Sequence, residues 1–299
     1  MTDENPAAPS APQLLKTVAD VRRWRAQARS DGKTVGFVPT MGALHDGHLS
    51  LFRASKSEND LTLASIFVNP TQFNDATDLE KYPRTLDADF AACAHVGVDA
   101  IFAPDAAEMY ADDDRTRVDV YELTDGLCGL SRPGHFRGVT TVVLKLFNIA
   151  QPHRAYFGRK DAQQLFVVRR MVRDLMLDVE IIDCPIIRDA DGLALSSRNA
   201  RLTPPMRKDA LAAMRQFAVA VERFNAGRER RPLDIIARMM ENIISTTREV
   251  EIDYAQFVHL PDLTEADEPV PGQDYMFAIA LIVGGESPVR LIDNYFVKG

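Results

Sequence analysis

The sequence predicts an α/β protein in which a largely parallel sheet is followed by a smaller α+β domain. Short apolar runs alternate with helix-period segments over the first two thirds of the chain, and after about residue 187 the order changes to two helices and then three strands. A chain of 299 residues is also long enough for two domains. Strands that alternate with helices form βαβ units, which build parallel sheets.

The first two thirds supply the elements of the parallel sheet. Strands are expected over residues 33–38, 61–68, 99–103, 155–157 and 179–182, and helices over 47–59, 86–95, 139–150 and 161–175. In the last helix Leu165, Val168, Val172 and Leu175 recur at helical spacing and should form one apolar face. Sheets of this kind bind ligands at the carboxyl ends of their strands.

The last third predicts the smaller domain. A Pro204-Pro205 step opens a helix that should reach about residue 227, and a second helix is expected at 233–247. Strands are expected at 251–258, 275–283 and 289–297. The expected division is therefore a disordered tail over 1–13, an α/β domain over 14–187 and an α+β domain over 188–299.

Composition excludes several classes of protein. The formal charge of −8 and the pI of about 5.3 argue against a general nucleic-acid binder, which needs clustered Lys and Arg. No apolar stretch is long enough to span a bilayer, and the acidic Pro/Ala-rich N-terminus lacks the features of a signal peptide. Cys93, Cys128 and Cys184 lie far apart and predict buried thiols in a reducing compartment. These features predict a soluble cytoplasmic protein.

The most specific pattern is the segment 39–48 (PTMGALHDGH), which directly follows the first expected strand. Gly42 favours a turn, and Gly47 removes a side chain where backbone would approach a ligand. His45 and His48 stand three residues apart at a helix start, so both imidazoles can point the same way. A helix N-terminus suits phosphate, and imidazole can donate to phosphoryl oxygens as charge develops on a leaving pyrophosphate. The segment therefore predicts a nucleotide site.

An alternative for the same segment is that His45 caps the helix and His48 is a satisfied surface histidine. For a lone histidine that alternative would be the better interpretation. The HxGH spacing at the end of a first strand favours the nucleotide site.

A second candidate segment, 158–164 (GRKDAQQ), lies between an expected strand and an expected helix. Lys160 would stand near the helix start, where the dipole disfavours a cation unless an anion binds there. Asp161 and Gln164 also fit a capping box, with Asp161 as the cap and Gln164 at the third helical position. Capping is an equal alternative for Gln164, but it does not explain Lys160.

A third candidate segment, 193–199 (LALSSRN), follows Arg188-Asp189-Ala190-Asp191-Gly192. Ser196, Ser197 and Arg198 can hold a triphosphate through charge-assisted hydrogen bonds. Ser-Ser-Arg is common in ordinary loops, so this interpretation depends on its order after HxGH.

Three further segments leave their alternatives open. Gln72 in VNPTQF (68–73) could hydrogen-bond a substrate hydroxyl or carboxylate, or could belong to an ordinary Asn-Pro turn. Residues 131–138 (SRPGHFRG) could close over an anion as a mobile basic loop, or could be a solvated connection. Asp112–Asp114 offer acidic ligands for a metal, but such a charge run favours a solvated turn. No zinc-ligand spacing occurs.

Together these segments resemble the pantoate–β-alanine ligase (pantothenate synthetase) family over nearly the whole chain. The matching strings are PTMGALHDGH, FVNPTQF, DLEKYPRT, RPGHFRGV, FGRKDAQQ and DGLALSSRN, with RLIDN near the C-terminus. The resemblance implies a Rossmann-like domain of the nucleotidylyltransferase and class I synthetase type for ATP and pantoate, a lid domain over 188–299, and a homodimer. Arg159 where the family usually has Glu, Ala162 where relatives often have an aromatic, and a longer segment at 283–288 depart from the family pattern.

The resemblance also implies a two-step reaction. (R)-Pantoate attacks the α-phosphorus of Mg·ATP to give pantoyl adenylate and pyrophosphate, and β-alanine then displaces AMP to give pantothenate. His48 would be the proton donor, with His45 beside it on the phosphates and Lys160 as a further catalytic group. Gln72 and Gln164 would hold pantoate, and Gln72 would also lie near β-alanine. The implied ATP-binding residues are Met41, Gly42, Ala43, Leu44, His45, Asp46, Gly47, His48, Gly158, Arg159, Lys160, Asp161, Ile187, Leu195, Ser196, Ser197 and Arg198.

Two other functions remain open. A nucleotidylyltransferase that moves AMP or CMP onto a phosphate-bearing substrate would also use HxGH, although Gln72 and Gln164 favour a small hydroxy acid. A tRNA-handling or purely nucleotide-binding module is disfavoured by the acidic charge and by the lack of an appended basic domain. The expected partners are therefore small molecules, with no nucleic acid and no membrane, and the ligands of Mg²⁺ are not predicted.

Overall fold

The computed structural model describes residues 11–299, and the chain divides into two compact units. Unit 1 contains the residues up to Val118 together with Arg137–Phe157 and Val172–Cys184. Unit 2 contains Asp119–Phe136, Gly158–Met171 and Pro185–Gly299. The main change thus falls at residues 184–185, and two earlier segments join unit 2. The functional domain bounds at 187 and 188 stay a prediction.

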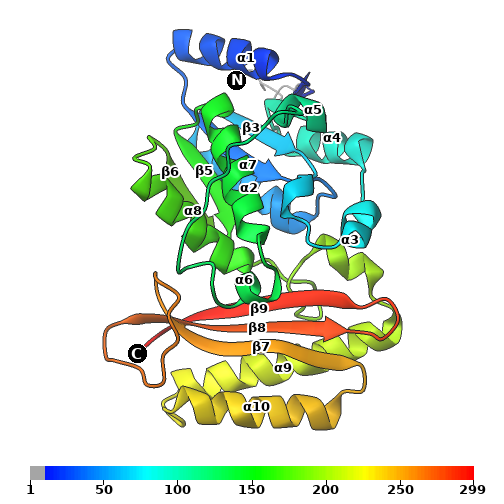
Figure 1. The fold of residues 1–299 in the computed structure, drawn as a ribbon, viewed down its shortest axis with the longest axis vertical. Helices are drawn as coiled ribbons and strands as arrows, with labels where there is room; N and C mark the ends of the chain where they lie inside the picture. The colour runs from blue at the N-terminus through cyan, green and yellow to red at the C-terminus, as the bar shows by residue number, and fades with distance from the viewer. Residues whose placement is uncertain (1–10) are drawn as a thin grey trace, which may run out of the picture. The chain divides into compact units, whose positions relative to one another are not determined.

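Unit 1 is built around a sheet with the strand order β1-β4-β3-β2-β5-β6 (Figure 1). The strands are β1 (Gln13–Leu15), β2 (Val35–Thr40), β3 (Leu61–Ile66), β4 (Ala100–Phe102), β5 (Arg154–Gly158) and β6 (Glu180–Cys184). The pairs β1–β4, β4–β3, β3–β2 and β2–β5 are parallel, which confirms the predicted sheet. Because parallel strands end at the same edge, the segments that follow β2 and β3 begin side by side.

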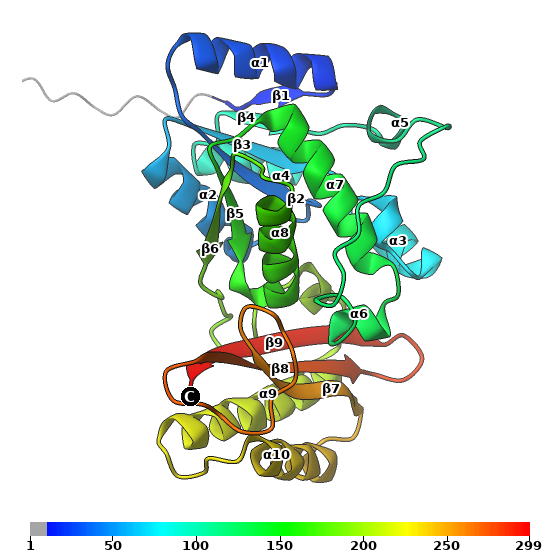
Figure 2. The same ribbon diagram turned by 60° about the vertical axis from the view of Figure 1, so that its left-hand side comes forward.

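Helices cover both faces of this sheet. The helical segments of unit 1 are α1 (Val18–Ser30), α2 (Asp46–Glu58), η1 (Pro70–Gln72), α3 (Ala76–Lys81), α4 (Leu86–His95), α5 (Ala106–Met109) and α7 (His135–Ala150). Neighbouring strand residues point to opposite faces, and Phe37 meets Phe147 of α7 while Val38 packs in one cluster with Phe52 of α2 (Figure 2). The expected helices at 47–59 and 86–95 are therefore confirmed as α2 and α4.

Helix α1 is an element that the sequence analysis did not predict. Thr17 and Asp20 form a capping box, in which the N–H of Asp20 donates to Thr17 Oγ1 and the N–H of Thr17 donates to Asp20 Oδ2, both over 3.1 Å. That four-residue signal was present in the sequence. Residues 1–10 of the expected tail lie outside the described residues, and Gln13 already belongs to β1.

Unit 2 contains an antiparallel sheet with the order β7-β8-β9 and two long helices (Figure 1). Its elements are α6 (Cys128–Ser131), η2 (Arg159–Asp161), η3 (Ser197–Arg201), α9 (Pro204–Asn225), α10 (Pro232–Thr246), β7 (Val250–His259), β8 (Asp274–Val283) and β9 (Val289–Lys298). Phe217 and Phe224 of α9 pack in one core with Phe257 and Phe277 of the sheet. The predicted order of two helices and three strands is confirmed.

Helix α8 (Ala162–Asp174) contributes residues to both units and corrects one expectation. Leu165 and Val168 are fully buried, as predicted. Leu175, however, lies beyond the helix end and is 46% exposed, so the expected apolar face is one turn too long. The three cysteines are buried free thiols, as expected. No helix within residues 11–299 has the length and apolar character needed to cross a membrane.

Candidate active site

The two histidines of the HxGH segment lie beside each other at the start of α2. Their ring centroids are 4.1 Å apart, with an interplanar angle of 37°. His45 occupies the N-cap position, and its backbone N–H donates to Nδ1 of His48 over 3.4 Å. The prediction that both imidazoles point the same way is confirmed, and the alternative that His45 stands at the cap is correct as well. Both side chains are half-buried at the positive end of a 13-residue helix.

The backbone before these histidines is held by a carboxylate that the sequence analysis did not select. Asp89 of α4 is 2% exposed, and it accepts the N–H groups of Ala43 at 3.0 Å and Leu44 at 2.8 Å. Gly42 has a φ of +81°, and a Cβ there would lie 2.8 Å from Asp89 Oδ2. The turn thus requires glycine. Since Ala43 and Leu44 give their N–H groups to Asp89, donors for phosphate have to come from the imidazoles and the start of α2.

Gln72 lies next to the same turn because β2 and β3 are parallel neighbours. Thr40 and Ile66, the last residues of the two strands, pair in register. Nε2 of Gln72 lies 3.0 Å from Sδ of Met41, 31 positions earlier in the chain. The local Asn-Pro turn is present too, since Asn69 Oδ1 accepts the N–H of Thr71. The structure therefore brings the HxGH segment and the VNPTQF segment together within unit 1.

In unit 2, Lys160 lies in the 3₁₀ turn that precedes α8. Its Nζ is 3.6 Å from Oδ1 of Asp161, and its side chain is 20% exposed. The carbonyl oxygens of Arg159 and Lys160 accept hydrogen bonds from Nδ2 of Asn294 at 2.9 and 3.0 Å. The prediction that Lys160 stands near a helix start is confirmed, and its catalytic part stays a prediction.

The two adjacent glutamines of this segment have different surroundings. Gln163 is 6% exposed and donates to the carbonyl oxygens of Leu123 and Gly126, both at 2.9 Å, while its Oε1 accepts the N–H of Cys128 at 2.9 Å. Gln163 therefore holds the preceding segment of unit 2. Gln164 is half-buried and takes the third position of α8, as the capping pattern predicted.

The Ser-Ser-Arg segment begins directly opposite Ile187. The N–H of Leu195 donates to the carbonyl oxygen of Ile187 over 3.0 Å. Ser196 precedes the 3₁₀ turn η3, and its Oγ accepts the N–H of Arg198 at 3.3 Å. The expected ATP-binding positions 187 and 195–198 are therefore neighbours in unit 2.

Strand β9 holds both of these unit 2 segments through two consecutive residues that the sequence analysis did not select. Asp293 is 3% exposed and binds the guanidinium of Arg188 at 2.6 and 2.9 Å. Asn294, 5% exposed, holds the carbonyl oxygens of Arg159 and Lys160. The sequence signal was the RLIDN string, which was noted only as a family ending.

The segment 131–138 is corrected from a loop to a helix junction. Ser131 ends α6, and α7 already begins at His135, four residues before its expected start. Pro133 and Gly134 separate the two helices, and Gly134 has a φ of +80°. The start of α7 also approaches the Asn-Pro turn, since a Cβ at Gly138 would lie 2.4 Å from the carbonyl oxygen of Thr71.

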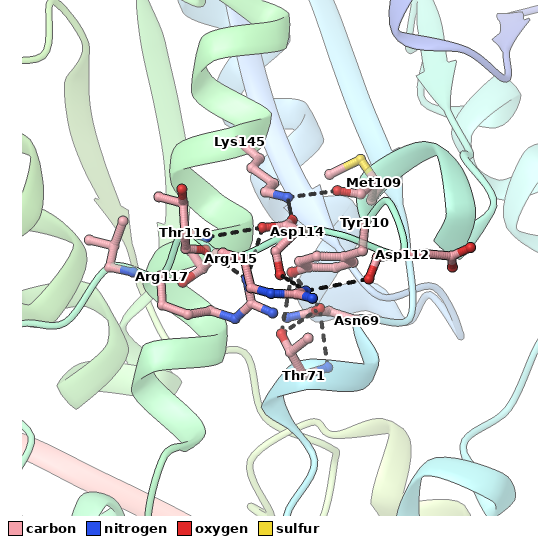
Figure 3. A network of polar contacts seen from close by, with 12 residues as sticks. Asn69, Thr71, Met109, Tyr110, Asp112, Asp114, Arg115, Thr116, Arg117 and Lys145 are labelled. Atoms are coloured by element: carbon pink, nitrogen blue, oxygen red, sulfur yellow. Dashed lines mark hydrogen bonds and ion pairs between the residues drawn. The ribbon is translucent and has the colours of Figure 1, made fainter.

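The acidic run at 112–114 is neither a plain solvated turn nor a metal site. Asp114, whose side chain is 13% exposed, pairs with Arg117 at 3.0 Å and with Lys145 (Figure 3). Among residues 11–299, no group of three or more His, Cys, Asp or Glu side chains is placed to hold a metal ion.

Comparison with known proteins gives one consistent family. The pantoate-beta-alanine ligase family matches residues 13–296. The chain is 50% identical over 286 residues to a pantothenate synthetase of Moorella thermoacetica, covering 96% of this chain and 99% of that one. It is 49% identical over 284 residues to the pantothenate synthetase of Thermotoga neapolitana, covering 94% and 98% of the two chains.

Solved structures agree with the sequence matches. Pantothenate synthetase from Thermus thermophilus aligns with a TM-score of 0.86 at 43% identity, covering 96% of this chain and all of that chain. A pantoate-beta-alanine ligase from Francisella tularensis, solved with beta-gamma ATP and beta-alanine, aligns with a TM-score of 0.75 at 33% identity, covering 95% and 97% of the two chains. The chain belongs to the pantoate–β-alanine ligase family of enzymes.

Proposed function

We propose that this enzyme condenses (R)-pantoate with β-alanine at the expense of Mg·ATP, through a pantoyl-adenylate intermediate, to give pantothenate, AMP and pyrophosphate. The observation that carries the proposal is the contact between two segments of unit 1. A pair of imidazoles stands at the start of α2, and the same turn contacts Gln72 through Met41. A phosphate-binding helix start and an amide for a small acid are thus adjacent.

The first step activates a poor electrophile. A carboxylate oxygen of pantoate forms a bond to the α-phosphorus, and the bond between that phosphorus and the bridging oxygen to the β-phosphate breaks. The electron pair stays on pyrophosphate, so charge increases there. His45, His48 and Lys160 would donate hydrogen bonds to this charge, with His48 as the proton donor.

The second step forms the amide. The amine of β-alanine attacks the acyl carbon of the mixed anhydride, AMP leaves with the electron pair of the broken carbon–oxygen bond, and the amine loses a proton. Neither step needs a covalent enzyme intermediate, so positioning and electrostatic stabilisation supply the catalysis. Gln72 and Gln164 would hold pantoate, and Gln72 would also approach β-alanine.

ATP would be bound by residues from both units. Unit 1 would contribute Met41–His48, and unit 2 would contribute Gly158–Asp161, Ile187 and Leu195–Arg198. Mg²⁺ enters as part of the Mg·ATP substrate, a role in which it takes most of its ligands from phosphate oxygens and water. We also propose a cytoplasmic homodimer, as expected for this family.

Mass spectrometry of a reaction with ATP and pantoate but no amine tests the proposal. The expected result is an acyl adenylate retained on the enzyme and pyrophosphate release that requires pantoate. Pyrophosphate release without pantoate, or with a phosphate-bearing substrate in its place, would instead indicate a nucleotidylyltransferase. Binding of tRNA with a steep salt dependence would indicate a nucleic-acid function.

A further inference from the structure

The side chain of Asn69, at the end of the strand that leads to Gln72, has only one possible amide orientation. Asn69 is 1% exposed. The N–H of Thr71 can only donate, and it lies 3.4 Å from Oδ1. The carbonyl oxygen of Gly138 can only accept, and it lies 3.1 Å from Nδ2. These two backbone groups fix which end of the Asn69 amide is oxygen and which is nitrogen.

This orientation passes to Gln72. Nδ2 of Asn69 also donates to Oε1 of Gln72 at 3.0 Å, so the Gln72 carbonyl is an acceptor on the Asn69 side. The NH₂ group of Gln72 therefore lies on the other side of its amide, toward Sδ of Met41 at 3.0 Å. Gln72 thus offers donors, rather than a carbonyl, on the side that faces the nucleotide turn.

Tyr110 lies at the other end of this chain of hydrogen bonds (Figure 3). Its hydroxyl donates to Oδ1 of Asn69 at 2.9 Å and lies 3.3 Å from Thr71 Oγ1. The three groups form a polarised sequence in which Tyr110 donates to Asn69 and Asn69 donates to Gln72. Hydrogen bonds arranged in one direction strengthen one another.

Charged side chains hold the ring of Tyr110 in place. Nζ of Lys145 lies 4.2 Å from the ring centroid and donates to the carbonyl oxygen of Met109 at 2.8 Å. Cζ of Arg117 lies 5.9 Å from the same centroid. Asp114 pairs with both cations, which neutralises them. Burial raises the pKa of the Tyr110 hydroxyl, so it stays protonated and remains a donor.

We propose that Tyr110 is a positioning residue for the acid substrate: its hydroxyl orients Asn69, and Asn69 in turn makes Gln72 present its NH₂ group to the oxygen atoms of pantoate. The inference deepens the proposed function and rests on it for the assignment of pantoate to Gln72. Carboxylate and hydroxyl oxygens both accept hydrogen bonds, so a fixed amide donor suits such a hydroxy acid.

The variant that tests the proposal is Tyr110→Phe, which keeps the ring and its cation contacts and removes only the hydroxyl. The matched control is Tyr156→Phe in the same unit. Tyr156 is fully buried, and its hydroxyl accepts from Asn59 at 2.7 Å and donates to Glu58 at 2.9 Å. Both variants lose a buried phenol hydrogen bond, but only Tyr110 leads to Gln72.

The expected result is a rise of about 3- to 10-fold in the KM for pantoate in Tyr110→Phe, with the KM for ATP unchanged. Tyr156→Phe should lower the melting temperature and leave both KM values unchanged. In an Asn69→Asp background, Tyr110→Phe should add no further rise, because its effect passes through Asn69. An unchanged pantoate KM in Tyr110→Phe, or an equal rise for ATP and pantoate, overturns the proposal.

A substrate-free measurement separates this inference from the proposed function. The side-chain amide NMR signals of Asn69 and Gln72, assigned with Asn69→Asp and Gln72→Glu, should shift in Tyr110→Phe and stay in place in Tyr156→Phe. Signals that do not respond to Tyr110→Phe overturn the relay. If the wild-type enzyme leaves pantoate unconsumed while these signals do shift, the proposed function fails and the orientation of Gln72 by Tyr110 stands.

Discussion

The candidate segments of unit 1 and those of unit 2 are held in different ways. In unit 1, the turn before α2 follows a central strand, and Asp89 from a neighbouring helix binds its backbone. In unit 2, the segments around Lys160 and Arg188 are bound by Asn294 and Asp293, which lie 134 and 105 positions later in the chain. Unit 1 thus places its site through sheet topology, whereas unit 2 depends on two adjacent side chains of one strand.

The difference shows how far the effect of one substitution should reach. Loss of Asp89 should disturb a single turn, because the parallel strands still bring β2 and β3 to the same edge. Loss of Asp293 or Asn294 should disturb segments that have no strand pairing of their own with β9. The two units nevertheless should serve one chemical step if both contribute to ATP.

The largest expected effect tests that common step. Lys160→Ala in unit 2 and His48→Ala in unit 1 should each slow adenylate formation by about 10²- to 10³-fold, the scale for one electrostatic donor to developing charge. Pantoate binding should change far less. Single-turnover formation of the adenylate from ATP and pantoate measures the rate. Lys208→Ala, an exposed lysine of α9, is the matched control, and a near-normal rate in Lys160→Ala would remove Lys160 from the chemistry.

A smaller effect is expected when the unit 1 turn loses its carboxylate. Asp89→Asn keeps the shape but removes the charge and one acceptor from the N–H groups of Ala43 and Leu44. Hydrogen bonds to a charged group contribute about 1.5–3 kcal/mol, so kcat/KM for ATP should fall about 10- to 100-fold.

The control for this change is Asp87→Asn, an exposed residue of the same helix, which should behave as wild type. If Asp89→Asn retains full activity, the turn does not depend on Asp89 for its conformation. Its melting temperature separates a local effect from general loss of stability.

The unit 2 anchor should give a still smaller change. Asn294→Asp replaces two donors with a carboxylate that faces the carbonyl oxygens of Arg159 and Lys160. The 158–161 turn should loosen, and the KM for ATP should rise about 5- to 10-fold, since two neutral hydrogen bonds are lost. Hydrogen exchange should accelerate in this turn. Asn242→Asp on exposed α10 is the control, and unaltered exchange in Asn294→Asp would contradict the anchoring role.

The smallest effect concerns the pH dependence of stability in unit 1. His153 Nδ1 accepts the N–H of Val35 at 2.8 Å, and burial lowers the pKa of His153 below its ordinary value of 6.5. The folded state therefore resists protonation, so this contribution is fully present above pH 6.5 and is lost as the pH falls through the window below it. Urea unfolding between about pH 5 and pH 8 measures it. His153→Asn keeps an acceptor without titrating, so its stability should depend less on pH; an equal slope would exclude His153 as the cause.

Much of the fold was predictable because its signals are local. The helix at 86–95 agrees residue for residue with α4, and the strands at 275–283 and 289–297 agree to within one residue with β8 and β9. Helix α1 was missed although Thr17 and Asp20 supply a capping box. The predicted end of α8 at Leu175 was wrong, because apolar spacing alone does not show where burial stops.

The candidate site was predictable where residue type and order have a chemical meaning. The HxGH spacing places two imidazoles on one side of a helix start, and helical geometry alone makes them neighbours. Asp89, Asp293 and Asn294 were missed because a single Asp or Asn in a helix or strand has no distinctive spacing. Their importance comes from backbone groups of distant segments, which no local pattern reveals.

The sequence by itself determined the parallel sheet, the smaller antiparallel sheet, the paired histidines and the family of the chain, since these depend on periodicity and on short ordered motifs. Only the tertiary structure decided which carboxylate binds the turn before α2, which strand holds the Lys160 segment, and which end of the Gln72 amide faces that turn. The physical reason is that hydrogen-bond partners of buried polar groups are chosen by three-dimensional proximity, and buried groups must find a partner wherever the fold supplies one.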